Sequence, residues 1–302
     1  MTLTIGVLAG TDHIAVGLVN NNRLAGAVRR FPEVERGSTL AEMPPQEIVQ
    51  TIAQQIELFE ESRTVAGIGV GFPGVIRDGV VEDSPNLQQV KGQKLRDELN
   101  GLFTQRGIAA PAHIVHDADA LAAGIAATHD QLDKQIRVWA LMGDGVGFGR
   151  YPQVEGFWEA GHSVVTLDPK ENFCGCGGVG HLEGIMGNRA MRLRFLDLEP
   201  EEVFEQARSG DPRCGDFVKL WHRALAAATA TNIHMDGPGK FIISGPNARY
   251  VQINLLDSYL HEMVKMSPLQ GSMLEVVPST DETAIIGAGV SAAHASQAQG
   301  NS

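Results

Sequence analysis

Four residues of this chain have the types and the spacing of metal ligands: His162, Cys174, Cys176 and His181. Two thiolates separated by one residue can hold a soft metal ion when further ligands fold over it, and two histidines complete a tetrahedral set. Because protein atoms would fill all four positions, such a metal would hold a loop in shape and would not activate water. The spacing alone leaves a second interpretation open, in which the two cysteines are buried or free thiols.

Composition restricts the classes of function. A chain of 302 residues is long enough for two domains that each have a core, and a hydrophobic content of 43% indicates a compact globular protein. The net charge of −12 argues against nucleic acid as a partner, because phosphate binding requires a basic surface. No apolar run approaches a membrane span and no export signal precedes the chain, so we expect no membrane contact and a cytoplasmic location.

The elements that must position these residues alternate between strands and helices. In the first half we expect strands at 3–8, 14–20, 24–31, 65–70 and 113–115, and helices after Pro44-Pro45 and at 119–127. In the second half we expect a strand at 138–142, a glycine-rich turn at 143–149 followed by a hairpin, helices at 182–195 and 217–233, strands at 241–243 and 273–277, and a final helix from Thr283.

A strand, a glycine-rich turn and a second strand open each half, at 6–19 and 141–149. Two such α/β halves predict a two-lobed ribonuclease-H-like fold, as in the actin, hexokinase and Hsp70 superfamily, with a cleft between the lobes. We assign the N-terminal lobe to 1–117 and the C-terminal lobe, with the metal loop, to 118–292. The sequence leaves open whether the final helix packs back on the N-terminal lobe. We expect 293–302 to be a disordered tail and Trp158 to line the cleft.

Five motifs, spread over nearly the whole chain, resemble those of the ROK family (repressors, open reading frames and sugar kinases). The run 69–74, GVGFPG, is similar to G-x-G-x-P-G, 85–87 to P-N-L, and 116–120, HDADA, to N-D-A-N-A. The runs 159–162, EAGH, and 174–183, CGCGGVGHLE, are similar to E-x-G-H and C-x-C-G-x-x-G-C-x-E. His181 stands where that family has a cysteine. Histidine is an equally good zinc ligand, so the resemblance implies a structural Zn²⁺ held by Cys2His2.

The resemblance also implies an activity. Sugar kinases of this family transfer phosphate from ATP to a hexose or hexose derivative, and the likeness gives Asp117 the role of catalytic base. A positioned base contributes roughly 10²–10⁴ in rate. The same likeness assigns sugar binding to Gly71, Gly74, Asn86, His116, Glu159, His162 and Glu183. Alternatively, Asp117 is an N-cap of the helix that follows it, and Asp119 is an acid favoured in a first helical turn.

The nucleotide-binding motifs are altered. Laid on the family's D-x-G-G-T, residues 8–12 place Leu8 at the acid and Asp12 at the hydroxyl. A register shifted by one residue restores Gly10-Thr11 but places Val7 at the acid, so neither register supplies the aspartate. In the family's G-T-G-I-G-G-G, here 143–149, Asp144 replaces a threonine that contacts phosphate. The family's G-G-G turn reads SGPN at 244–247. A carboxylate about 4 Å from phosphate costs roughly 4 kcal/mol unless a cation intervenes. The nucleotide-binding candidates are Gly10, Thr11, Asp12, Gly143, Asp144, Gly145 and Gly245.

Three hypotheses follow. In the first, the protein is a sugar kinase in which Asp12 and Asp144 hold Mg²⁺ that bridges to ATP. In the second, it binds a sugar as a sensor or scaffold and no longer transfers phosphate. In the third, it performs non-kinase chemistry on a sugar with Asp117, Asp12 and Asp144. Both new aspartates also suit turns for structural reasons alone.

The expected partners are a small-molecule sugar and, from the family resemblance, a second copy of the chain in a homodimer. The repressors of the family carry a DNA-binding helix-turn-helix ahead of the sugar fold. This chain is acidic and begins almost directly on its first strand, so we expect no DNA binding.

Overall fold

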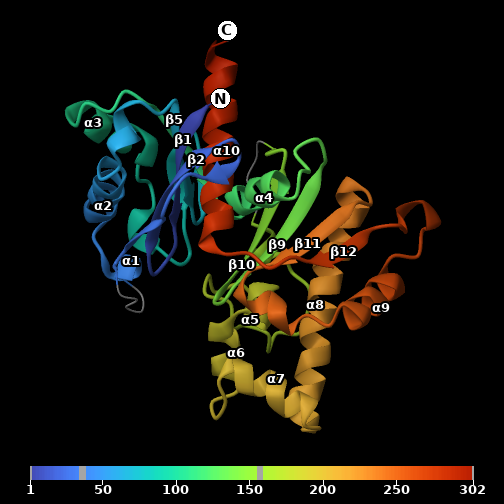
Figure 1. Ribbon diagram of the computed structural model, residues 1–302. Coiled ribbons are helices and arrows are strands. Elements are labelled where there is room, and N and C mark those ends of the chain that lie inside the picture. Colours follow the sequence, from blue (N-terminus) through green and yellow to red (C-terminus); the bar gives the residue numbers. More distant parts are fainter. Residues whose placement is uncertain (1, 34–38, 155–158, 301–302) are drawn as a thin grey trace. The chain divides into compact units, whose positions relative to one another are not determined.

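The computed structural model (Figure 1) describes residues 2–33, 39–154 and 159–300. Its contacts divide the chain into two compact units. The first unit contains 1–135, 149–158 and 279–302, and the second contains 136–148 and 159–278. The division therefore falls later in the chain than the expected boundary after residue 117, and the final helix belongs with the first unit. Trp158 lies outside the described residues.

A six-stranded sheet forms the centre of the first unit, in the order β3-β2-β1-β5-β8 with β4 also paired to β2. Strands β1, β5 and β8 run parallel, and β2 is antiparallel to β1. The expected strand 24–31 is two short strands, because Gly26 turns the chain between them with a φ of 120°. The strands are β1 (Leu3–Ala9), β2 (Ile14–Asn20), β3 (Arg23–Leu24), β4 (Arg29–Phe31), β5 (Gly67–Phe72) and β8 (Ala112–His116).

Helices cover both faces of this sheet (Figure 1). Helix α2 (Pro45–Glu57) buries Ile48, Ile52 and Ile56, the stripe expected from their spacing, in a core shared with α3 (Leu95–Gln105). Helices α4 (Asp117–Thr128) and α10 (Asp281–Gly300) pack together on the other side. The short helix α1 (Thr39–Glu42) and the hairpin β6 (Val75–Arg77) and β7 (Val80–Asp83) complete the unit, with one-turn segments η1 (Glu60–Arg63) and η2 (Gln88–Val90).

Glycines allow α10 to approach its neighbours closely. A β-carbon added at any of four glycines would lie only 1.7–1.9 Å from a backbone oxygen across these contacts: Gly6, Gly69, Gly124 and Gly287. Helix α10 continues to Gly300, so residues 293–300 are helical and the expectation of a disordered tail there is wrong. Within this segment the Ser296 hydroxyl donates to Ala66 O at 3.1 Å.

The second unit is built on a four-stranded sheet in the order β10-β9-β11-β12. Only Gly143 and Asp144 form the turn between β9 and β10, whereas the expected glycine-rich turn extended to Gly149. The strands are β9 (Ile136–Met142), β10 (Gly145–Tyr151), β11 (Lys240–Ser244) and β12 (Met273–Val276).

Helix α8 (Pro212–Asp236) is the longest of the second unit, and its sequence explains its ends. The Asp211 carboxylate accepts the N–H of Cys214 at 2.8 Å, Pro212 opens the first turn, and Gly237 with a φ of 82° ends the helix. The expected helix 182–195 is divided at Gly187, and α7 and α9 were not predicted. The other helices are α5 (Glu183–Met186), α6 (Asn188–Arg194), α7 (Pro200–Arg208) and α9 (Ile253–Met263), with one-turn segments η3 (Ala160–His162), η4 (Pro246–Tyr250) and η5 (Ser267–Leu269).

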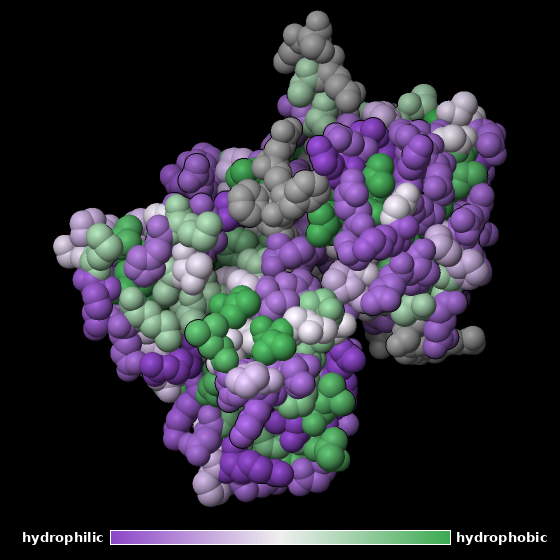
Figure 2. All heavy atoms as spheres, turned by 180° about the vertical axis from the view of Figure 1, so that it is seen from behind, coloured by the Kyte–Doolittle hydropathy of each residue, from purple (hydrophilic) through white to green (hydrophobic). Residues whose placement is uncertain are grey.

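The face of the molecule seen in Figure 2 is predominantly polar. In Figure 2 hydrophilic residues dominate the visible face and hydrophobic ones stand in small separate groups. Among the described residues, no helix has both the length and the apolar character needed to cross a membrane.

Candidate functional site

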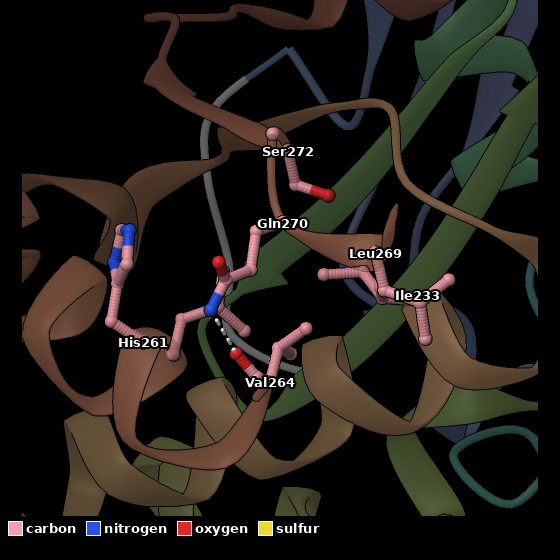
Figure 3. Close-up of a pocket in the computed structure, with 8 residues that line it drawn as sticks. Ile233, His261, Val264, Leu269, Gln270 and Ser272 are labelled. Carbon is pink, nitrogen blue, oxygen red and sulfur yellow. Dashed lines mark hydrogen bonds between the residues drawn. The ribbon is translucent and has the colours of Figure 1, made fainter. Parts of the chain in front are cut away.

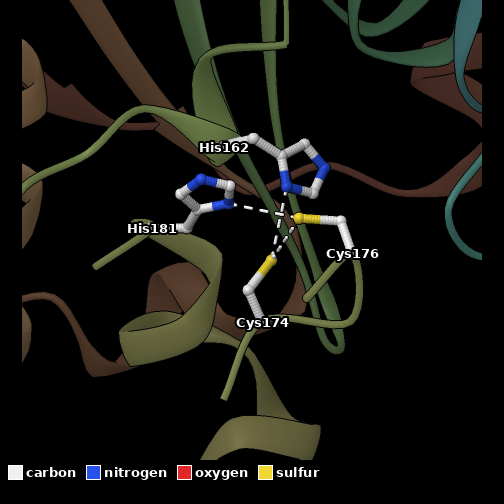
Figure 4. A group of neighbouring side chains, drawn as sticks. All are labelled: His162, Cys174, Cys176 and His181. Carbon is white, nitrogen blue, oxygen red and sulfur yellow. Dashed lines mark hydrogen bonds between the residues drawn. The ribbon is translucent and has the colours of Figure 1, made fainter. Parts of the chain in front are cut away.

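The four predicted metal ligands come together in the second unit (Figure 4). The Cys174 Sγ atom lies 3.3 Å from His162 Nδ1 and 3.4 Å from Cys176 Sγ, and Cys176 Sγ lies 3.2 Å from His181 Nδ1. All four ligand atoms are within 4.8 Å of one another. Metal–sulfur distances of about 2.3 Å and metal–nitrogen distances of about 2.0–2.1 Å give a tetrahedron with edges of roughly 3.3–3.8 Å. The set therefore has the size and the chemistry to hold one metal ion.

Backbone hydrogen bonds hold the two histidine-bearing segments side by side. Val165 N–H donates to Gly180 O at 2.8 Å, and Leu182 N–H donates to Ser163 O at 3.0 Å. Gly178 leaves room for the His181 ring, because a β-carbon there would lie 2.0 Å from the ring. These contacts hold His162 and His181 on neighbouring segments of the loop.

Burial raises the pKa of the Cys174 thiol to about 12, so a metal ion would have to supply the charge that stabilises its thiolate. Glu183 lies beside this thiol: its Oε1 is 3.7 Å from Cys174 Sγ, and its Oε2 accepts the N–H of Val146 at 3.2 Å. Burial raises the pKa of Glu183 as well. The carboxylate of Glu159 lies 3.9 Å from His162 Nε2, on the side of the ring away from the thiols. The two glutamates therefore flank the metal set.

In the first unit, Asp117 stands where β8 ends and α4 begins. Its Oδ1 accepts the N–H of Ala118 at 2.7 Å and lies 3.2 Å from His116 Nε2. Among the described residues Oδ2 has no hydrogen-bonding partner, and the side chain is 27% exposed. The N-cap of α4 is His116, so the alternative prediction that Asp117 caps the helix is wrong. This arrangement leaves one carboxylate oxygen available to a ligand.

Asp119, expected to be only a first-turn acid, has a further contact. Its Oδ1 accepts the N–H of Arg150 at 2.8 Å, and burial raises its pKa. It therefore connects α4 to the end of β10.

The other sugar-binding candidates of this unit surround the same turn. Gly71 lies at the end of β5, where a β-carbon would be 3.0 Å from Ala120 Cβ and 3.6 Å from Asp117 Cα. Gly74 has a φ of 107°, and a β-carbon there would lie 2.3 Å from Asp83 O. Gly74 is thus required by its backbone conformation and packing, and a side chain at Gly71 would press on Ala120, whether or not either residue contacts a sugar. Asn86 is exposed in the turn after β7.

The turn between β1 and β2 holds the first nucleotide-binding candidates. Gly10 N–H donates to His13 O at 2.8 Å, and Thr11 O accepts from the N–H groups of Leu40 and Ala41 at 3.1 and 3.2 Å. The Asp12 carboxylate lies 2.9 Å from Nδ1 of His13. The turn is thereby tied to the first residues of α1.

On the side away from Asp12, the His13 ring contacts Asp281, the first residue of α10. His13 Nε2 lies 2.9 Å from the carboxylate of Asp281, which Arg30 also contacts. The hydrogen bonds to Asp12 and Asp281 raise the pKa of His13 to about 9. The hydrogen bond from His13 lowers the pKa of Asp12. Burial raises the pKa of Asp281, but the contacts with His13 and Arg30 have the larger combined effect, so the pKa of Asp281 is lowered. Asp12 is therefore engaged by a cationic side chain.

The remaining nucleotide-binding candidates gather in the second unit. Gly143 O accepts the N–H of Asn188 at 2.9 Å and the side-chain amide of Asn247 at 3.3 Å. Gly245 has a φ of 96°, and a β-carbon there would lie 2.6 Å from Leu141 O. Asp144 lies 3.7 Å from the Arg192 guanidinium, and Gly145 begins β10. The two predicted segments 143–149 and 244–247 thus meet at one end of the β9–β10 hairpin.

Sequence reasoning missed His13, Arg30 and Asp281 in the first unit and Asn188 and Asn247 in the second. A histidine directly after Asp12 was the one local signal. Asp281 lies 268 residues from His13 along the chain, so only the fold reveals their contact.

The two units each contain a cavity among the described residues. The first unit has one of about 660 Å³, bounded by the β6–β7 hairpin, β8, the first turn of α4 and one side of α10, and its wall includes Gly74 and His116. The second unit has one of about 20 Å³ near Ile233 and Leu269, where the Gln270 amide donates to Val264 O at 3.0 Å (Figure 3). The smaller cavity has room for about one water molecule and is not a sugar site.

Comparison with known proteins agrees with the motifs. The family model described as ROK family matches residues 4–294. A glucokinase of Pyrobaculum calidifontis is 31% identical over 140 residues, which cover 43% of this chain and 46% of that protein. The DNA-binding transcriptional dual regulator NagC of Escherichia coli is 25% identical over 269 residues, 80% of this chain and 63% of that protein. The match thus spans less than two thirds of either relative.

Solved structures confirm the fold. A ROK hexokinase from Thermus thermophilus has a TM-score of 0.77 at 21% identity, with 98% of this chain and 99% of that chain covered. A ROK family glucokinase from Streptomyces griseus in complex with glucose and AMPPNP has a TM-score of 0.69 at 22% identity, with 97% and 99% covered. The predicted ribonuclease-H-like α/β fold is therefore confirmed.

Proposed function

The chain belongs to the ROK family, and from that membership we propose that it transfers the terminal phosphate of ATP to a hydroxyl group of a hexose or hexose derivative. The observation that supports this most directly is the turn at Asp117. Its carboxylate stands at a strand–helix junction with one oxygen engaged by backbone and the other without a partner among the described residues. A base in that state is suited to take the proton of a substrate hydroxyl as it attacks phosphorus.

For sugar binding we propose Gly71, Gly74, Asn86 and His116 beside the Asp117 turn, and the family resemblance adds Glu159, His162 and Glu183 beside the metal ligands. Carboxylate and imidazole groups pair well with ring hydroxyls, which are both donors and acceptors. The Pyrobaculum calidifontis relative, named a glucokinase, supports the assignment to sugar phosphorylation.

The metal ion we propose is Zn²⁺, held by Cys174, Cys176, His162 and His181 in a closed structural site. When bound, it would stabilise the thiolates and fix the loop. His162 presents Nδ1 to the sulfur atoms and Nε2 towards Glu159, so a metal on Nδ1 would set the orientation of the face that meets the sugar.

A second candidate function is sugar binding without phosphoryl transfer from ATP. It is favoured by one observation, the bonding of Asp12 to a cationic His13 at the position where family members have a phosphate-contacting hydroxyl. A sensor or scaffold would need the sugar-binding residues but not a nucleotide-binding β1–β2 turn.

Titration calorimetry of Mg-ATP, without sugar, into protein of verified zinc content tests the choice. For a kinase we expect micromolar to low-millimolar binding that Asp144→Thr leaves unchanged or strengthens, followed by ADP release with at least one hexose of a panel. Absence of binding, unrestored in Asp12→Thr/Asp144→Thr, would rule out the ATP-dependent kinase. Sugar binding alone, or non-kinase sugar chemistry at Asp117, would then remain.

A further inference from the structure

One pair of charged side chains joins the loop of the metal ligands to the end of helix α6. Arg194, the last residue of α6, presents two nitrogen atoms to the carboxylate of Glu171. Its Nη1 donates to Oε1 at 2.9 Å, and its Nη2 donates to Oε2. Only 10% of the Glu171 side chain and 19% of the Arg194 side chain are exposed. The contact is therefore a bidentate ion pair that is largely removed from water.

The backbone of Glu171 lies between two of the segments that carry metal ligands. Its carbonyl oxygen accepts the N–H of Gly180, the residue before His181, at 2.6 Å. Its own N–H donates to Asp168 O at 3.0 Å, which closes the turn at the start of the loop. Cys174 follows three residues later, and its sulfur atom points towards the other ligands (Figure 4). A displacement of Glu171 would therefore disturb the segments of both Cys174 and His181.

Two aromatic rings hold the Arg194 guanidinium in place. Its Cζ lies 4.7 Å from the ring centroid of Phe173, which adjoins Cys174, and 5.3 Å from that of Phe217 in α8. Phe217 belongs to the core of the second unit. A planar guanidinium can stack on an aromatic ring and still present two parallel N–H groups to a carboxylate, whereas a lysine ammonium has no such fork. Arg194 thus connects the metal loop to the core of the unit.

The ion pair has no substitute among the described residues. Neither side chain has another charged partner there, and Arg194 Nε is buried without an acceptor. Removing one partner of a buried pair leaves the charge of the other uncompensated, so the remaining side chain is driven towards water. For Glu171 this would pull the start of the loop away from α6.

The other side of the loop packs against α5. A β-carbon at Gly184 would lie 2.9 Å from Cys174 N and 3.3 Å from Cys174 Cβ. Cys174 is thus held from two directions, by α5 directly and by Arg194 through its neighbour Phe173. Residues that orient metal ligands without touching the metal typically change the metal affinity about 10–100-fold when they are replaced.

We propose that Arg194 is a positioning residue of the metal loop. Its ion pair with Glu171 and its stacking on Phe173 hold the segments of Cys174 and His181 at the spacing that one metal ion requires. The proposal rests on the structural Zn²⁺ proposed above, and it names a residue outside the ligand set that controls how tightly the ion is held.

Competition with a chromophoric zinc chelator tests it. Arg194→Gln and Glu171→Gln should each weaken zinc binding about 10–100-fold. The double variant should lose about as much as the weaker-binding single variant, because each single change already breaks the pair. Arg194→Lys keeps the charge without the fork and should weaken zinc binding about three- to tenfold.

Arg213→Gln is the matched control, because Arg213 makes similar contacts in the same unit outside the loop. Its Nη2 donates to both carboxylate oxygens of Asp197 at 3.2 and 3.0 Å, and its Cζ lies 5.0 Å from the ring centroid of Phe195. The zinc affinity of Arg213→Gln should stay within twofold of the wild-type value.

Cobalt substitution supplies a readout that a general loss of stability would not move. In the Co²⁺-loaded protein, the thiolate-to-metal charge-transfer band reports the bonds to Cys174 and Cys176. Arg194→Gln should alter this band, and Arg213→Gln should leave it unchanged. If Arg194→Gln does not fold, Arg194→Lys and Glu171→Gln provide the same comparison.

Zinc affinities within twofold of wild type in the Arg194 and Glu171 variants, or an unaltered cobalt spectrum, would overturn the proposal. Additive losses in the double variant would also overturn it, because the two residues would then act independently, and so would an equal loss in Arg213→Gln. A wild-type chain that holds no zinc would overturn the metal assignment and this proposal together. Since none of these measurements involves ATP or a sugar, failure of the kinase function would show separately, as absence of ADP release.

Discussion

At the scale of single residues, the charge of His13 is part of the structure of the β1–β2 turn. The ring lies between Asp12 and Asp281, and hydrogen bonds to both raise its pKa from 6.5 to about 9. Because the folded-state pKa lies above the unfolded value, this stabilisation is fully present below pH 6.5 and is lost as the pH rises through about 9.

His13→Gln should therefore destabilise the protein in a pH-dependent manner. One pKa unit corresponds to about 1.4 kcal/mol, and the loss should be roughly 1–2 kcal/mol at pH 6 because the Asp12 side chain, 56% exposed, is screened by water. Urea unfolding of both proteins at pH 6 and pH 9.5 measures the difference, which should shrink at the higher pH. A difference in stability that is the same at pH 6 and pH 9.5 would contradict the charged pairing. His129→Gln is the control, because His129 is exposed and does not contact Asp12 or Asp281.

Asp117→Asn keeps the shape of the side chain and removes its basicity. If Asp117 is the base of the proposed transfer, kcat should fall about 10²–10⁴-fold while the affinity for the sugar changes by less than about fivefold. An ADP-release assay and calorimetry of the sugar measure the two quantities. Weaker sugar binding with unchanged kcat would instead make Asp117 a binding residue only. As a control, Asp97→Asn at an exposed aspartate of α3 should leave kcat and the sugar affinity unchanged.

At the scale of elements, the metal loop depends on side chains brought together from two short segments. We expect one zinc ion per chain by elemental analysis, with Cys174→Ser lowering occupancy to below about one tenth and reducing the thermal midpoint by several degrees. Cys214→Ser is the matched control, because Cys214 is also a buried thiol of the second unit but lies at the start of α8. Full zinc retention in Cys174→Ser would contradict the assigned ligand set.

Two helical glycines with opposite surroundings test the packing of α10. A β-carbon at Gly124 would lie 1.8 Å from Thr283 O, whereas one at Gly101 in α3 has nothing within 4 Å. Gly124→Ala should lower the free energy of unfolding by about 1–3 kcal/mol through overpacking, and Gly101→Ala should raise it by about 0.5–1 kcal/mol through helix propensity. Chemical denaturation of both variants measures this, and a stabilising Gly124→Ala would show that α10 is not packed as described.

Elements with a strong local pattern were predictable from the sequence. The apolar strands, the buried side of α2 and the middle of α8 follow rules that act within a few residues. The expected helix 217–233 missed the first five residues of α8, because the Asp-Pro start was not used. Helices α7 and α9 were missed, and the run 143–149 was read as a turn because glycine suggests one. Pairing in the sheet overrides that preference and makes Gly145–Tyr151 a strand.

At the scale of the whole molecule, the metal ligands could be predicted because they lie within twenty residues of sequence, from 162 to 181. The His13–Asp281 contact and the wall of the large cavity could not, since each joins residues from distant parts of the chain. Both depend on α10, which returns the C-terminal segment to the first unit. The sequence left this return open and placed the boundary after residue 117, because sequence order alone does not show that a chain leaves a unit and comes back.

Removing α10 should therefore affect the two units differently. A chain ending at Pro278 loses the helix that covers one side of β1 and β5, including buried Ile285 and Ala288, and it also loses Asp281. Hydrogen exchange should become fast in β1, β2 and β5, because their apolar residues would face water. The second unit should still bind one zinc ion per chain, since its ligands and core lie within 136–148 and 159–278. Slow exchange retained in β1 and β5 would mean that the first unit does not need α10. Loss of zinc together with the first unit would mean that the two units fold as one.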